Sequence, residues 1–150
     1  MKRAFVLFLV LLLHVFTAYA EDRPCVKQAE PLMTLKSSWD AISGAAIALP
    51  AECFDGYFGE SISDTIVRKS TKDWPGFVKE LAKHRTPNDK FFLLVLKSIN
   101  STLNPDDIKT LGKLTQGSCP HDLAAPCTVI SDRALKALAD YEVPASGGKP

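Results

Sequence analysis

The chain has 150 residues, 18 of them basic and 17 acidic, so its formal net charge is +1. No basic tract or stripe stands out, which argues against nucleic acid or an anionic membrane surface as a partner. The length suits one domain with its own hydrophobic core.

Residues 1–20 have the pattern of a secretory signal peptide. A short basic start and an apolar run are followed by the small-x-small cleavage site Ala18–Ala20. A membrane anchor is the alternative, but it needs roughly 18 or more apolar residues, and two polar side chains interrupt this run. Cleavage after Ala20 leaves 130 residues with a net charge of −1, because the leader contains two basic residues and no acid.

All four cysteines lie after this leader. An even number of cysteines in an exported protein is most simply explained by two disulfides, although four cysteines allow three pairings. We favour Cys119 with Cys127, because only a short proline-containing segment separates them, and therefore Cys25 with Cys53. The expected location is outside the cytoplasm, in the bacterial periplasm.

Apolar residues at helical spacing predict an all-α domain over residues 32–142, preceded by an extended lead-in (21–31) and followed by a flexible tail (143–150). No run of alternating strand pattern is convincing. The domain is expected to be a compact, disulfide-stabilised bundle of five or six helices. The predicted helices cover approximately residues 32–49, 50–69, 74–84, 87–101, 105–117 and 127–142.

The helix at about 87–101 is predicted to be the centre of the bundle, because it is apolar over most of its circumference. Thr86 can cap it, Pro87 suits the first helical position, and Asp89 occupies the position of a capping-box acid. Its apolar residues are Phe91, Phe92, Leu94, Val95, Leu96 and Ile99.

Other residues mark helix ends or weak points. Asp73 is predicted to cap the third helix and Asn104 the fifth, and Gly117 is predicted to end the fifth as a left-handed cap. Gly56 and Gly59 lie inside the second predicted helix, where each costs about 1 kcal/mol relative to alanine. They also leave a shallow notch where another backbone could approach.

No arrangement of residues predicts catalysis, and neither a cofactor nor a metal is expected. The two histidines after the leader, His84 and His121, have no serine elbow of the G-x-S-x-G type as a companion. His121 and Asp122 between Cys119 and Cys127 include metal-ligand types, but not at the tight spacing of a zinc site. The chain is expected not to be an enzyme.

The profile resembles the small periplasmic immunity proteins that protect bacteria from type VI secreted amidases. The similarity rests on the length, signal peptide, helical class and cysteine usage, together with the Cys-x-x-Gly-Tyr stretch from Cys53 to Tyr57. The resemblance implies a stoichiometric inhibitor that plugs the cleft of a peptidoglycan-cleaving effector enzyme. Since such proteins often dimerise, it also implies a possible homodimer, with no membrane insertion after the leader is removed.

An inhibitor of this kind needs an exposed surface with small polar groups that can reach into an enzyme cleft. The best candidate is the stretch from Gly59 to Ser63, flanked by an aromatic residue that could serve as an interface anchor. The predicted partner-binding residues are Asp55, Tyr57, Gly59, Glu60, Ser61 and Ser63.

Two alternatives remain. A periplasmic helical carrier or chaperone would bind an apolar ligand in a pocket lined by phenylalanines and a leucine. A small hydrolase would need His84 or His121 to line a cleft. The pocket of the carrier would be formed by Phe54, Phe58, Phe91, Phe92 and Leu96.

Overall fold

The computed structural model describes residues 23–142, so the predicted signal peptide (1–20) and the predicted tail (143–150) lie outside the described residues. The described part consists of helices and connecting turns and has no strand, which confirms the all-α prediction. It contains seven α-helices and three short 3-10 helices. In order these are α2 (Arg23–Ala29), η1 (Glu30–Leu32), α3 (Trp39–Ala48), η2 (Ala51–Cys53), α4 (Gly56–Lys72), α5 (Trp74–Lys83), α6 (Lys90–Ser98), α7 (Pro105–Gly117), η3 (His121–Leu123) and α8 (Ala124–Glu142).

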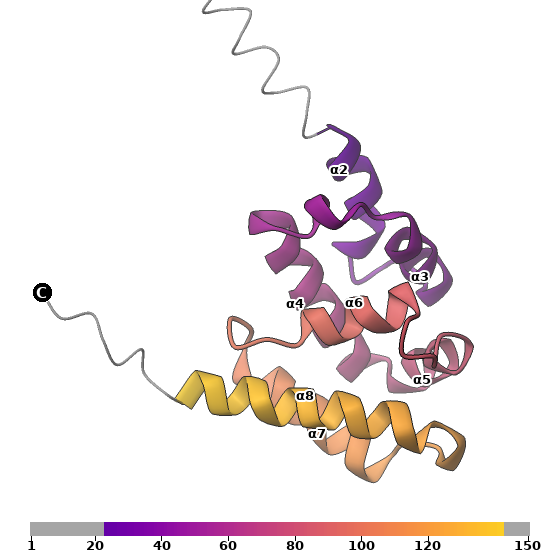
Figure 1. Cartoon of the computed structure of the whole chain (residues 1–150), viewed down its shortest axis with the longest axis vertical. Coiled ribbons are helices and arrows are strands. Elements are labelled where there is room, and N and C mark those ends of the chain that lie inside the picture. The colour runs from indigo at the N-terminus through magenta and orange to yellow at the C-terminus, as the bar shows by residue number, and fades with distance from the viewer. Residues whose placement is uncertain (1–22, 143–150) are drawn as a thin grey trace, which may run out of the picture.

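Helix α6 crosses the middle of the molecule, with α3 on one side and the α7–α8 pair on the other (Figure 1). Its side chains Phe91, Phe92, Leu94 and Val95 are buried in the main hydrophobic core. The central position predicted for this segment is therefore confirmed. The helix is shorter than predicted, because Asp89, and not Thr86, is its N-cap: one carboxylate oxygen accepts from the backbone N–H groups of Phe91 and Phe92.

The segment predicted as an extended lead-in is helical instead, as α2 and η1. A helix of seven residues is too short to be stable by itself in water. Here the tertiary structure stabilises it, because Ala29 and Leu32 are completely buried and Cys25 is bonded to Cys53 in η2. This helix raises the number of helices above the predicted five or six.

Helix α3 begins at Trp39 and not at residue 32, because the Ser38 hydroxyl caps it by accepting from the Ala41 N–H. The predicted second helix is likewise divided. Its start forms η2, the chain turns at Phe54 and Asp55, and α4 begins at Gly56 with a φ of +49°. Glycine adopts this left-handed conformation without the steric cost that a side chain brings.

The remaining boundaries follow local signals more closely. Asp73 caps α5 and Asn104 caps α7, as predicted. Gly117 is the last helical residue of α7 and its φ is not positive, so the predicted left-handed cap is wrong. Helix α8 begins at Ala124, three residues earlier than predicted, because η3 leads directly into it.

The two disulfides join Cys25 to Cys53 and Cys119 to Cys127, which are the pairs favoured from the sequence. The first ties α2 to η2, and the second ties the start of α8 to the connection that follows α7. All four cysteines are thus bonded, which indicates an oxidising, exported environment. Within residues 23–142, none of the helices has the length and hydropathy needed to cross a bilayer.

Candidate functional site

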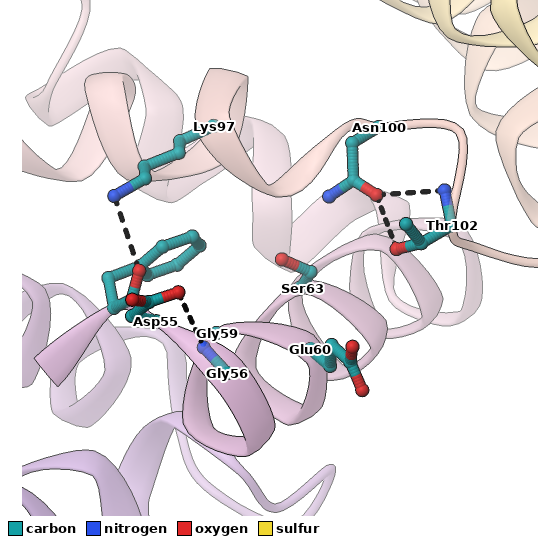
Figure 2. Close-up of a pocket in the computed structure, with 9 residues that line it drawn as sticks. Asp55, Gly56, Gly59, Glu60, Ser63, Lys97, Asn100 and Thr102 are labelled. Carbon is teal, nitrogen blue, oxygen red and sulfur yellow. Dashed lines mark hydrogen bonds between the residues drawn. The ribbon is translucent and has the colours of Figure 1, made fainter.

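A surface groove of about 360 Å³ lies between the first turns of α4 and the end of α6 (Figure 2). We call it the α4–α6 groove. It brings together two segments that lie far apart in the sequence. Its lining residues are Phe54, Asp55, Gly56, Gly59, Glu60, Ser63, Lys97, Asn100 and Thr102.

One side of the groove is formed by the start of α4. The Asp55 carboxylate caps this helix by accepting from the Gly56 N–H at 2.7 Å. At Gly59, an added Cβ would lie 3.3 Å from the carbonyl carbon of Phe54, which is closer than most Cβ atoms approach a neighbour. Glycine therefore allows the turn after η2 to lie directly against α4, and this turn shapes the groove.

Lys97 of α6 forms the opposite side. Its ammonium nitrogen lies 4.2 Å from the centroid of the Phe54 ring and donates to the Phe54 carbonyl oxygen at 3.4 Å. A cation above an aromatic face is attracted by the ring quadrupole. No carboxylate of the described residues forms an ion pair with Lys97, so its charge is available to a bound group.

The far end of the groove is held by a compact turn after α6. The Asn100 side-chain oxygen accepts from the Thr102 N–H at 3.0 Å and from the Thr102 hydroxyl at 2.6 Å. The Asn100 amide group donates to the Ser98 carbonyl at 3.3 Å. These bonds fix the side chain of Asn100 at the rim.

Ser63 lies in the groove between Lys97 and Asn100 in Figure 2. Ser63 as a whole is 1% exposed, its hydroxyl makes no hydrogen bond to a residue of the described part, and the hydroxyl oxygen keeps some access to the groove. The hydroxyl can both donate to and accept from a group that enters the groove.

The structure places the predicted partner-binding residues in two groups. Asp55, Gly59, Glu60 and Ser63 line the groove, and Ser61 does not. Tyr57 is outside the lining but 72% exposed on the same first turn of α4, with its ring against that of Phe58. The lining residues missed from the sequence are Phe54 and Gly56, just before and at the start of α4, and those of α6 and the turn after it, which only the tertiary contact between α4 and α6 brings here.

His121 lines a second groove, of about 490 Å³, beside the Cys119–Cys127 disulfide, together with Asp132 and several hydroxyl groups. Its ring makes no hydrogen bond to another side chain among the described residues, so nothing there orients it as a general base. Within residues 23–142, no three histidine, cysteine or acidic side chains gather as metal ligands would.

His84 belongs instead to a network of polar residues that joins α3, α5 and the start of α6. Its ring nitrogens lie 3.4 Å from the buried Glu80 carboxylate and 3.0 Å from Asp89. Burial raises the pKa of Asp89, but hydrogen bonds from His84 and from two backbone N–H groups outweigh this effect and lower the pKa. The Lys83 hydrogen bond lowers the pKa of exposed Asp40, and the same bond raises the pKa of Lys83.

The aromatic pocket of the carrier alternative is only partly present. Among its predicted residues, Phe54 lines two surface grooves, whereas Phe91 and Phe92 are packed in the hydrophobic core.

No known protein family, curated protein or solved structure matches this chain.

Proposed function

We propose that the protein is an exported inhibitor, of the immunity-protein type, that binds a peptidoglycan-cleaving amidase effector through the α4–α6 groove and its rim. The observation that carries the proposal is a groove that places the Ser63 hydroxyl, without a hydrogen bond to a described residue, beside charges of both signs from Asp55, Glu60 and Lys97. A loop of a partner enzyme can supply hydrogen-bond partners for these side chains. The periplasm is the compartment in which the two proteins would meet.

The groove supplies complementary contacts for an inserted peptide segment. Lys97 can donate to a carbonyl or carboxylate of the partner, and Asp55 and Glu60 can accept from its N–H groups or basic side chains. Ser63 can complete either kind of contact. Because the groove walls are held by internal hydrogen bonds, little additional ordering is needed on binding.

Tyr57 gives the rim an aromatic anchor. Exposed tyrosines bury a large area on association at a low entropic cost, and they are enriched among the residues that dominate binding energies. With 72% of its surface exposed, Tyr57 contributes little to the fold and is free to contact a partner.

The test is inhibition of purified cell-wall amidases. The oxidised protein is titrated against each enzyme, and the release of peptides from purified peptidoglycan is measured. We expect at least one enzyme to be inhibited at one-to-one stoichiometry. The double variant Tyr57→Ala/Glu60→Ala should weaken this inhibition at least tenfold, and Ser63→Ala should weaken it further.

A matched control is available at the end of α8, where Tyr141 is 54% exposed and Glu142 is also at the surface. Tyr141→Ala/Glu142→Ala should leave inhibition unchanged. If the Tyr57/Glu60 variant inhibits as well as the natural protein, the α4–α6 groove is not the inhibitory surface. If none of the amidases is inhibited, the proposed target class is wrong.

A further inference from the structure

A third groove, of about 370 Å³, lies between the end of α3 and the exposed face of α6. We call it the α3–α6 groove. Its lining is mainly apolar, formed by side chains that include Leu49, Pro50, Phe54 and Leu93. Leu93 is 48% exposed, and Ile47 beside the groove is 45% exposed.

Lysines stand at both ends of this groove. Lys90 donates to the Ile47 carbonyl oxygen at 3.0 Å, and Lys97 donates to the Phe54 carbonyl oxygen at 3.4 Å. Neither lysine forms an ion pair with a carboxylate of the described residues. Each ammonium group is therefore positioned by the backbone and still able to pair with an outside anion.

The spacing of the two lysines and Leu93 along α6 indicates the shape of the partner. Lys90, Leu93 and Lys97 occupy positions i, i+3 and i+7 of α6, so they form one stripe along the helix. The two lysines are about 10 Å apart along the helix axis. A second helix packed against this stripe would present residues at the same i, i+3 and i+7 spacing.

We propose that the α3–α6 groove binds an amphipathic helix of another protein, in which an apolar side chain is flanked by acidic residues one heptad apart. The acidic residues pair with Lys90 and Lys97, and the apolar side chain lies on Leu93 and the groove floor. The two grooves share Phe54 and Lys97, whereas Lys90 and Leu93 line only the α3–α6 groove, so the Leu93→Asp variant tests this contact apart from the proposed inhibition.

The positive charge of the groove disfavours three other occupants, namely another segment of this chain, a second copy of the chain and a fatty acid. The segments outside the described residues contain two acidic residues, Glu21 and Asp22, which are adjacent in the chain and therefore cannot match two lysines one heptad apart. A second copy that used the same stripe would place lysines against lysines. A fatty acid has one carboxylate and could pair with only one end of the groove.

The test is selection from a display library of amphipathic helical peptides, with the oxidised protein as the target. We expect the enriched peptides to carry Asp or Glu seven positions apart around a central apolar residue. Binding of the synthesised peptides, followed by fluorescence anisotropy, should fall at least tenfold for Lys90→Glu/Lys97→Glu and for Leu93→Asp. A peptide with lysines in place of its acids should bind the Lys90→Glu/Lys97→Glu variant and restore the affinity.

Lys109→Glu/Lys113→Glu on α7 is the matched control, because it reverses two exposed lysines away from the groove and should leave binding unchanged. Circular dichroism establishes that each variant is folded.

Enriched peptides without acidic residues, or binding that survives Lys90→Glu/Lys97→Glu, would overturn the proposal. Dodecanoate that displaces the peptide and binds the Lys90→Glu/Lys97→Glu and Lys109→Glu/Lys113→Glu variants with equal affinity would also overturn the proposal. Self-association of the protein that Leu93→Asp abolishes would overturn it as well. Since Tyr57→Ala/Glu60→Ala leaves this groove intact, that variant should keep peptide binding even if the inhibitory function fails.

Discussion

The indole N–H of Trp39 donates a hydrogen bond to the Asp73 carboxylate at 3.0 Å, which joins the first residue of α3 to the residue between α4 and α5. The same carboxylate caps α5 by accepting from the Gly76 N–H at 3.1 Å. A Cβ at residue 76 would overlap this carboxylate, so glycine leaves the space that the cap requires. One side chain thus connects three helices.

Replacing Asp73 should therefore destabilise the protein more than the loss of an ordinary cap. A lost cap costs about 1 kcal/mol, and the lost bond to Trp39 adds about 1 kcal/mol. We expect Asp73→Ala to lower the free energy of unfolding by about 2 kcal/mol, measured by urea titration. The two bonds use different carboxylate oxygens, so Asp73→Asn keeps an acceptor for only one of them and should cost about half as much. Equal losses for the two variants would show that the charge of Asp73, and not its hydrogen bonds, is what matters.

The two disulfides should differ in their contribution to stability. Cys25 and Cys53 are 28 residues apart in sequence, and Cys119 and Cys127 are 8 apart. The chain-entropy relation gives about 3.6 kcal/mol for the longer loop and about 2.5 kcal/mol for the shorter one. We expect Cys25→Ser/Cys53→Ser to lower the urea midpoint more than Cys119→Ser/Cys127→Ser does. The reverse order would mean that contacts of the two disulfides in the folded state outweigh loop entropy.

Asp89 should make stability depend on pH in acid. Burial raises the pKa of Asp89, but hydrogen bonds from His84 and from the backbone of α6 together outweigh burial. The folded-state pKa therefore lies below the ordinary value of 3.8. A lowered folded pKa means that the stabilisation is fully present above the unfolded pKa and is lost as the pH falls through the folded one. We expect the natural protein to lose stability more steeply below about pH 4 than Asp89→Asn does. Asp106→Asn, at an exposed position in the first turn of α7, is the control and should keep the steep acid dependence.

Glu80 is the most deeply buried acid of the described residues, with 3% exposure. It accepts from the Ser43 hydroxyl at 2.5 Å and from the Lys83 ammonium group at 2.8 Å, which joins α3 to α5. Removing one partner of a buried polar network typically costs about 3 kcal/mol. We expect Glu80→Ala to cost about this much in thermal or urea unfolding, and Glu80→Gln to cost less. Glu60→Ala, at an exposed position, should change stability by less than about 0.5 kcal/mol. A neutral effect of Glu80→Ala would mean that water replaces the carboxylate.

Part of the α4–α6 groove could be predicted from the sequence, because a run of small and polar residues after Asp55 is a local pattern. Lys97 and Asn100 could not be predicted. They are separated from Asp55 by two helices, and nothing in their own neighbourhood indicates which surface they face. The same holds for the α3–α6 groove, since Leu93 lies in a segment that the sequence predicts to be a central helix buried on several sides.

The sequence by itself determined the helical class and the caps at Asp73 and Asn104, and its short spacing favoured the pairing of Cys119 with Cys127, because each depends on interactions between near neighbours in the chain. The tertiary structure decided the rest. Helix α2 forms because its buried side chains and the Cys25–Cys53 bond offset the entropy of ordering a short helix. Both grooves exist because α6 packs between α3 and α4, and contacts between distant segments carry no local signal in the sequence.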